Sequence, residues 1–159
     1  MDDAGFEDWY RLEHPRLANG LYLICGSVES ARDATDEAFA RAAARWGRVR
    51  RMDSPGGWTF KVGLNLLRRE ARRKGREARA VERIPTPATP PVELPDAELW
   101  AAVRALPDRQ RQVVVMRFVG DLHEADIAKV LGIARGTVAS NLSRALDTLA
   151  TRVLEQEAP

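Results

Sequence analysis

The chain has 159 residues, of which 45% are hydrophobic, 30% charged and 6% aromatic, which suits one ordinary soluble domain or two small ones. No stretch reaches the roughly 18 uncharged apolar residues of a membrane span, and the first eight residues are acidic where a signal peptide is basic, so we expect neither membrane insertion nor secretion. One cysteine, Cys25, and two histidines exclude an internal disulfide and a zinc site, so we expect a cytoplasmic protein with no metal and no cofactor.

The net charge of +2 conceals three blocks of different sign. Residues 1–40 carry 3 basic and 9 acidic side chains, residues 41–83 carry 14 and 4, and residues 84–159 carry 8 and 10. A strongly basic block beside an acidic one indicates a polyanionic partner at one place and a positively charged partner at another. Solvated helix faces are the alternative interpretation.

Both halves of the chain read as helical, because helix-favouring residues dominate and no window alternates with period two. Five of the nine prolines lie between Pro85 and Pro95, so residues 84–95 are a Pro-rich linker. The chain therefore divides into an N-terminal domain, residues 1–83, and a C-terminal domain, residues 96–159. We expect an all-α protein with helices near 4–25, 28–46, 55–80, 96–105, 108–119, 123–131 and 135–154.

The second helix has two different faces. Val28, Ala31, Ala38, Ala42 and Trp46 recur at core-facing spacing. The other face carries an acidic stripe: Glu29, Asp33, Asp36 and Glu37. Like charges three or four residues apart destabilise an isolated helix, so this stripe has no evident folding benefit. We interpret it as a dock for a basic protein surface, with a solvated helix face as the alternative.

The third helix begins at Ser54 as N-cap and Pro55 as first residue. One stripe is apolar and predicts a core face: Phe60, Leu64, Leu67 and Ala71. A tryptophan among cations suits single-stranded nucleic acid, because bases stack on the indole and phosphates meet the cations. The alternative interpretation places the Trp58 indole in the core instead of on a nucleic-acid-binding face. The predicted nucleic-acid face comprises Trp58, Lys61, Asn65, Arg68, Arg69 and Arg72, extended by a loop at residues 47–53 with Arg48, Arg50 and Arg51.

The C-terminal half contains a helix-turn-helix pattern. Ile127, Ala128 and Leu131 line a short helix, Gly132 ends it, and a longer helix follows. The longer helix has an apolar face that we expect to point inward: Val138, Leu142, Ala145, Leu146, Leu149 and Val153. The outer face of the longer helix carries side-chain types that read a DNA groove: Arg135, Thr137, Ser140, Asn141 and Arg144.

Taken together, these segments resemble the two-domain bacterial sigma factors of the extracytoplasmic-function (ECF) type. Region two of that family is similar to HPRLANGLYLICG at 14–26, ARDATDEAFARAAARW at 31–46 and SPGGWTFKVGLNLLRREARR at 54–73. Region four is similar to ALPDRQRQVVVMRFVGDLHEADIAKVLGIARGTVASNLSRALDTL at 105–149. The order of acidic helix, basic aromatic helix, proline linker and helix-turn-helix has few competing explanations.

The resemblance implies a transcription initiation factor whose partners are RNA polymerase core and promoter DNA. Asp33, Asp36, Glu37 and Phe39 match the segment that binds the clamp helices of the largest polymerase subunit. The loop at 47–54 and the helix from Trp58 to Arg72 match the part that opens and reads the minus-ten element. Arg109, Arg111 and the helix from Arg135 to Arg144 match the part that lies on the minus-thirty-five duplex. The resemblance also implies contact with the polymerase flap region, no enzymatic activity, and leaves open an anti-sigma partner.

Several positions depart from the family pattern. Asp36 stands where glutamine is frequent, and Arg69 where aspartate is frequent. Ala134 replaces the usual serine N-cap of the recognition helix, and Ala139 and Asn141 stand where basic residues are common. Residues 96–159 carry 8 basic and 9 acidic side chains, so we expect weak minus-thirty-five binding or an unusual sequence there.

Three other functional classes are alternatives to this interpretation. A sigma-like adaptor would bind polymerase or a regulator without reading promoters, and the thinned recognition helix is its main support. A dimeric helix-turn-helix repressor leaves the acidic stripe and the Trp58 face unexplained. An enzyme is disfavoured because no nucleophile, metal set or phosphate loop is evident.

Overall fold

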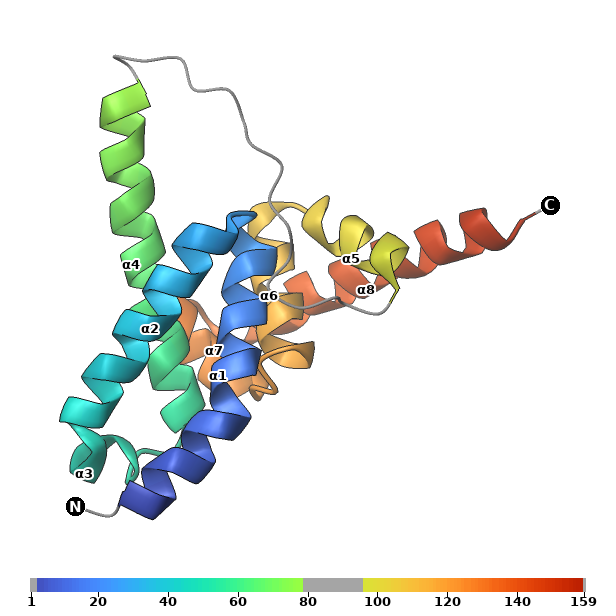
Figure 1. Ribbon diagram of the computed structural model, residues 1–159. Coiled ribbons are helices and arrows are strands. Elements are labelled where there is room, and N and C mark those ends of the chain that lie inside the picture. The colour runs from blue at the N-terminus through green and yellow to red at the C-terminus, as the bar shows by residue number, and fades with distance from the viewer. Residues whose placement is uncertain (1–2, 79–95, 159) are drawn as a thin grey trace.

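The computed structural model describes residues 3–78 and 96–158, and within those ranges every regular element is a helix. The expectation of an all-α fold is therefore confirmed. The predicted linker, residues 84–95, lies outside the described residues. Figure 1 shows the arrangement of the helices, coloured along the chain.

Three long helices and one short one form the N-terminal half: α1 (Asp3–Cys25), α2 (Val28–Ala44), α3 (Trp46–Val49) and α4 (Pro55–Ala78). Helix α2 packs against both α1 and α4 (Figure 1). Gly26 ends α1 with φ +74°, and the Ser27 hydroxyl accepts a hydrogen bond from the Ser30 amide to cap α2. Ser54 caps α4 as predicted, with its hydroxyl accepting from the Gly57 amide at 3.0 Å.

The segment expected as a loop at 47–53 begins instead with the single turn α3. The amides of Arg48 and Val49 both donate to the Arg45 carbonyl, and Trp46 and Val49 are buried. Burial of these two side chains favours a helical turn, which composition alone did not indicate. A second difference concerns Ala71, which is exposed instead of lying in the core.

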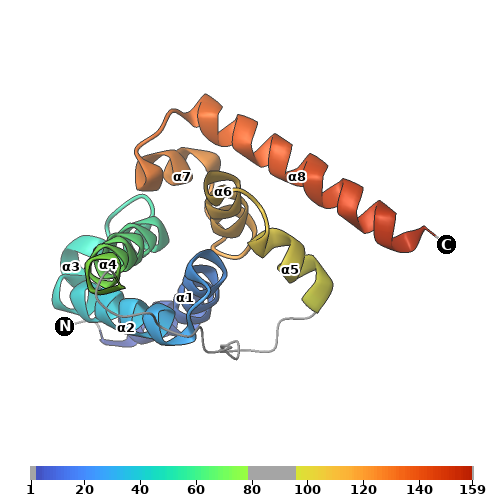
Figure 2. The same cartoon turned by 90° about the horizontal axis from the view of Figure 1, so that it is seen from above.

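The C-terminal half consists of α5 (Ala97–Arg104), α6 (Asp108–Phe118), α7 (Glu124–Leu131) and α8 (Arg135–Glu157). Gly132, with φ +65°, ends α7 and turns the chain into α8, which gives the expected helix-turn-helix. Figure 2 shows α8 running past α6 and α5 towards the C-terminus. Val113, Val114, Val115 and Met116 are all buried, because α6 is covered by α1, α7 and α8.

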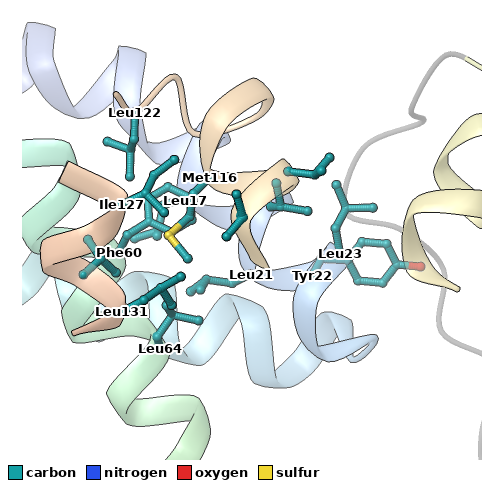
Figure 3. Close-up of a cluster of buried hydrophobic side chains, with 14 of the residues drawn as sticks. Leu17, Leu21, Tyr22, Leu23, Phe60, Leu64, Met116, Leu122, Ile127 and Leu131 are labelled. Carbon is teal, nitrogen blue, oxygen red and sulfur yellow. The ribbon is translucent and has the colours of Figure 1, made fainter. Parts of the chain in front are cut away.

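Both halves contribute to one continuous hydrophobic core. Leu17, Leu21, Phe60 and Leu64 lie in the same buried cluster as Met116, Leu122, Ile127 and Leu131 (Figure 3). A β-carbon at Gly20 would lie 2.7 Å from the Phe60 ring, and one at Gly120 would lie 2.8 Å from it. Glycines from both halves thus let α1 and the turn after α6 close on one aromatic ring.

Candidate nucleic-acid and protein interfaces

The predicted acidic stripe lies on the solvent side of α2. Two of its carboxylates have a neighbouring base: Glu37 accepts from Arg41 Nε at 2.8 Å, and Asp36 Oδ1 lies 3.4 Å from His14 Nε2. Pairs this exposed contribute at most about 1 kcal/mol, so they leave the stripe available to a basic partner. All four members are exposed: Glu29, Asp33, Asp36 and Glu37.

Phe39 does not share that exposed surface. Its side chain is 3% exposed, with ring centroids 5.2 Å from Trp9, 5.0 Å from Tyr10 and 5.4 Å from His14. The structure therefore places Phe39 in the core, where it holds α2 on α1. Its expected direct contact with polymerase is corrected to a supporting role beneath the stripe.

The basic face follows the length of α4 and continues into the segment before it. Spacings of three and four residues put the predicted side chains on one side of the helix. Their positive charge and exposure make this side of α4 a strongly basic surface. Its exposed members are Lys61, Asn65, Arg68, Arg69 and Arg72 on α4, with Arg48, Arg50 and Arg51 before it.

Trp58 joins this face to the core. One side of the half-buried indole packs against a small cluster that contains Trp46, Val49 and Met52. The other side lines a cavity of about 450 Å³. The ring is therefore half core and half accessible surface, so the core interpretation holds in part and the role of Trp58 in binding nucleic acid stays a prediction.

A shallow groove of about 220 Å³ separates the acidic stripe from α4. The Ser30 hydroxyl donates to Glu70 at 3.0 Å, and Lys74 Nζ lies 2.8 Å from Glu70 and 3.2 Å from Ser30 Oγ. Burial acts to raise the pKa of Glu70, but hydrogen bonds from Lys74 and Ser30 outweigh it and lower the pKa. The spacing of four residues predicts the ion pair between Glu70 and Lys74. Nothing in the sequence predicts the hydrogen bond that joins Glu70 to Ser30 on α2.

The outer face of α8 presents the expected groove-reading side chains. Arg135, Thr137, Ser140 and Arg144 are exposed, and Asn141 is half-buried. Ser140 Oγ donates to the Gly136 carbonyl and Asn141 Nδ2 to the Thr137 carbonyl, each at 2.9 Å. These polar groups are satisfied within the helix and must exchange those bonds before they bind a base. Ala134 provides no side-chain cap for α8, as its identity predicts.

Arg111 has a structural role in addition to any role at a binding surface. Its guanidinium donates to the carbonyls of Arg104 and Leu106 and pairs with Asp108 at 2.7 Å, and only 18% of its side chain is exposed. Arg111 thus closes the turn between α5 and α6, so its expected phosphate contact competes with three existing bonds. Arg109 is exposed.

None of the helices within the described residues is long and apolar enough to cross a membrane. Residues 3–78 and 96–158 also contain no group of three side chains that could hold a metal ion.

Comparison with known proteins gives matches to two family models, "Sigma-70 region 2" over residues 9–77 and "Sigma-70, region 4" over residues 96–149. The RNA polymerase sigma-E factor of Streptomyces antibioticus is 31% identical over 165 residues, covering 96% of this chain and 89% of the relative. The protein of the same name from Streptomyces coelicolor is 26% identical over 160 residues, with 96% and 88% covered.

A solved structure has a similar fold. The sigma factor RpoE of Bartonella quintana, crystallised with the anti-sigma factor NepR, superimposes with a TM-score of 0.75 at 21% identity, covering 97% of this chain and 99% of that one. CnrH in complex with the cytosolic domain of CnrY gives a TM-score of 0.61 at 21% identity, with 99% and 92% covered.

Proposed function

The chain belongs to the ECF sigma factors of bacterial RNA polymerase, and from that premise we propose which of its surfaces performs each step of promoter-directed initiation. A sigma factor binds RNA polymerase core and directs it to promoters through its region 2 and region 4. This chain carries both regions. The bonds made and broken in RNA synthesis belong to the polymerase, so the factor acts by binding and not as an enzyme.

Polymerase core docks on the acidic stripe of α2. The stripe is exposed, negatively charged and held rigidly by Phe39 beneath it and by the Ser30–Glu70 bond beside it. The clamp helices of the largest subunit supply the basic partner surface. Complementary charge favours rapid and correctly oriented association.

The minus-ten element is opened and read by α4 and the segment before it. A base leaving the duplex stacks on the accessible side of Trp58, and its phosphates lie along Lys61, Arg68 and Arg72. Strand opening is driven by this binding energy alone. Arg48, Arg50 and Arg51 add charge beside the indole.

The minus-thirty-five duplex lies on α8. Arg135 and Arg144 are exposed on α8 and Arg109 is exposed on α6, so the phosphate contacts of these side chains are few. Helix α8 has no side-chain N-cap, and the free amides at its start also bind phosphate. The apolar side chains of α8 that remain exposed suit the flap region of the polymerase: Leu146, Val153 and Leu154.

The proposal includes a cytoplasmic location, where polymerase and promoters are, and an anti-sigma partner of the kind bound to the sigma factor RpoE of Bartonella quintana. The observation that carries the proposal is the placement of an acidic helix and a basic, tryptophan-bearing helix side by side in one bundle, joined at Ser30 and Glu70.

In vitro transcription tests this proposal. The full chain is added to sigma-free core polymerase on a library of genomic fragments, and transcript starts are mapped. Starts that share sequence elements near minus ten and minus thirty-five support the proposal. Association with core that yields no factor-dependent starts would identify an adaptor instead.

A further inference from the structure

The cavity beside Trp58 has the size of a small-molecule site. Its volume of about 450 Å³ lies within the range of roughly 300–1,000 Å³ that is typical of ligand pockets. Arg51, Trp58 and Lys61 line it from the N-terminal half, and Asp126 and Lys129 line it from α7. The cavity is therefore a shared feature of both halves, beside the proposed strand-reading site on α4 and the segment before it.

Small and apolar residues keep the wall of this cavity open beside the indole. Gly57 is buried, and a β-carbon there would lie 2.7 Å from Ser54 Oγ and 3.8 Å from Cβ of Asp126. A side chain at position 57 would therefore narrow the space between α4 and α7. Met52 and Val130 also line the cavity, so one wall is apolar and aromatic.

Five charged side chains line the cavity: Arg51, Asp53, Lys61, Asp126 and Lys129. Within residues 3–78 and 96–158, none of the five makes an ion pair or a side-chain hydrogen bond. Their hydrogen-bonding groups are thus available to a ligand. A ligand that satisfies them must offer an anion to the three cations and hydrogen-bond donors to the two carboxylates.

A guanine nucleotide has all of these groups. Bases stack on indole rings, and phosphate oxygens accept charge-assisted hydrogen bonds from lysine and arginine. An ionised carboxylate only accepts hydrogen bonds, and guanine offers it two adjacent donors, N1–H and the N2 amino group. Adenine has an acceptor at N1, so a carboxylate beside the base disfavours adenine. Stacking, charge and the edge of the base therefore indicate the same ligand class.

We propose that this cavity binds a free guanine nucleotide, with its base on Trp58 and its phosphates among Arg51, Lys61 and Lys129. The promoter strand also offers bases and phosphates, but Lys129 lies on α7, next to the helix proposed to lie on the minus-thirty-five duplex. A strand at minus ten is therefore not expected to need Lys129, whereas a nucleotide in the cavity is. Nucleotide binding goes beyond the proposed function and does not depend on it.

Isothermal titration calorimetry on the full unmodified chain tests the inference, with GDP as the probe. We expect saturable binding of one GDP per chain. ADP should bind at least about tenfold more weakly, because two hydrogen bonds to a base edge discriminate by about this factor. Guanosine and inorganic pyrophosphate should also bind more weakly than GDP, because each lacks part of the ligand. Absence of GDP binding, or binding of ADP or pyrophosphate as tight as that of GDP, would overturn the site.

A variant on α7 locates the phosphates. Lys129→Ala removes one cation of the cavity at an exposed position and should weaken GDP binding about tenfold, because one hydrogen bond to a charged group is lost. Arg32→Ala removes the same charge at an exposed position of α2, outside the cavity, and should keep the affinity of the unmodified chain. Both variants lose the same long-range attraction, so equal GDP affinities would overturn the placement of the phosphates.

A second variant tests the contact with the base. Asp53→Ala with Asp126→Ala should remove the preference for GDP over ADP. Both nucleotides are measured on the same protein, and a fraction of unfolded chain lowers the apparent binding of both, so it cannot imitate a lost preference. An unchanged preference would show that the two carboxylates do not read guanine.

The last measurement separates a free nucleotide from the promoter strand. A single-stranded oligonucleotide carries a minus-ten element mapped with the unmodified chain, and its affinity should be the same for Lys129→Ala and for Arg32→Ala. A loss for Lys129→Ala as large as the loss of GDP binding would assign the cavity to the promoter strand instead. An unmodified chain that directs no transcription would overturn the proposed function and would leave the GDP result standing.

Discussion

The Ser30 hydroxyl donates a 3.0 Å hydrogen bond to the Glu70 carboxylate and so joins the acidic helix α2 to the basic helix α4. Ser30 is 5% exposed, and Lys74 completes the network by approaching both residues. The surface proposed to bind polymerase and the surface proposed to bind the promoter strand are thus fixed to each other.

Ser30→Ala should lower the free energy of unfolding by about 1 kcal/mol, because one buried hydrogen bond to a charged group is lost while Lys74 still pairs with Glu70. Urea denaturation measures the change. Ser143→Ala, at an exposed position of α8, is the control and should leave the unfolding midpoint in place. A Ser30→Ala midpoint equal to that of the control would contradict the role of the network.

The same network predicts a pH dependence. The lowered pKa of Glu70 means that its ionised form is stabilised by folding; this contribution is present above the unfolded value near 4.5 and is lost as pH falls through the lower folded value. Glu70→Gln should therefore be less stable than the unmodified chain at neutral pH. The difference should shrink under acid conditions, and a gap between the two unfolding curves that stays constant from neutral to acid pH would argue against this assignment.

Glu13 should make the opposite contribution to the dependence of stability on pH. Burial raises its pKa despite the neighbouring Arg16, so the charged form is disfavoured by folding. Stability therefore falls as pH rises from about 4.5 through the raised folded value. Glu13→Gln should be at least as stable as the unmodified chain at neutral pH and should lack that slope. Thermal unfolding across this pH range decides the matter, and a Glu13→Gln chain that is clearly less stable at neutral pH would show that the Arg16 pair outweighs burial.

The sequence predicted the individual helices better than the way in which they pack together. Helical periodicity identified most core positions of α4 and α8 because each helix spans several turns, but Ala71, Leu146 and Val153 were expected in the core and are exposed. Ser54 and Gly132 marked helix boundaries through backbone requirements that are local. Helix α3 was missed because a single turn has no period to detect. The contact of Phe60 with Gly120 joins residues 60 positions apart, and nothing local in either segment encodes it.

The candidate site shows the same division. Exposure of the acidic stripe and the basic face followed from helix geometry. Phe39 and Arg111 were assigned to surfaces through the family pattern, whereas the structure uses one in the core and the other in a turn. Spacing alone does not show whether a side chain packs within the fold or binds a partner.

Charge reversal should separate polymerase binding from folding. Asp33→Lys with Glu37→Lys should abolish association with core polymerase, because two repulsive contacts replace two attractive ones, while circular dichroism stays unchanged. Glu7→Lys with Asp8→Lys changes the same charge at exposed positions of α1 and should still co-purify with core. Co-purification of the α2 variant at the unmodified level would refute the docking surface.

Trp58→Ala should affect both stability and promoter opening, since the ring is half-buried. We expect a loss of about 2 kcal/mol in unfolding free energy, below the 3–5 kcal/mol typical of a buried tryptophan, together with a loss of about 1–3 kcal/mol in single-strand binding. Trp46→Ala, in the core beside it, should reach the larger stability cost. Trp58→Phe should restore much of the stacking, and a Trp58→Ala chain that opens promoters normally would remove the indole from the strand-reading site.

The recognition helix can be tested through salt dependence. Each phosphate contact contributes about −0.9 to the slope of log affinity against log salt. Ala139 is exposed on α8, one turn from Arg135, so Ala139→Lys should add one contact and steepen the slope for duplex containing the mapped minus-thirty-five element by about one unit. Ala101→Lys, also exposed but on α5, adds the same charge away from α8. Because long-range attraction acts on both variants, only a steeper slope for Ala139→Lys than for Ala101→Lys places α8 on the DNA, and equal slopes would exclude that placement.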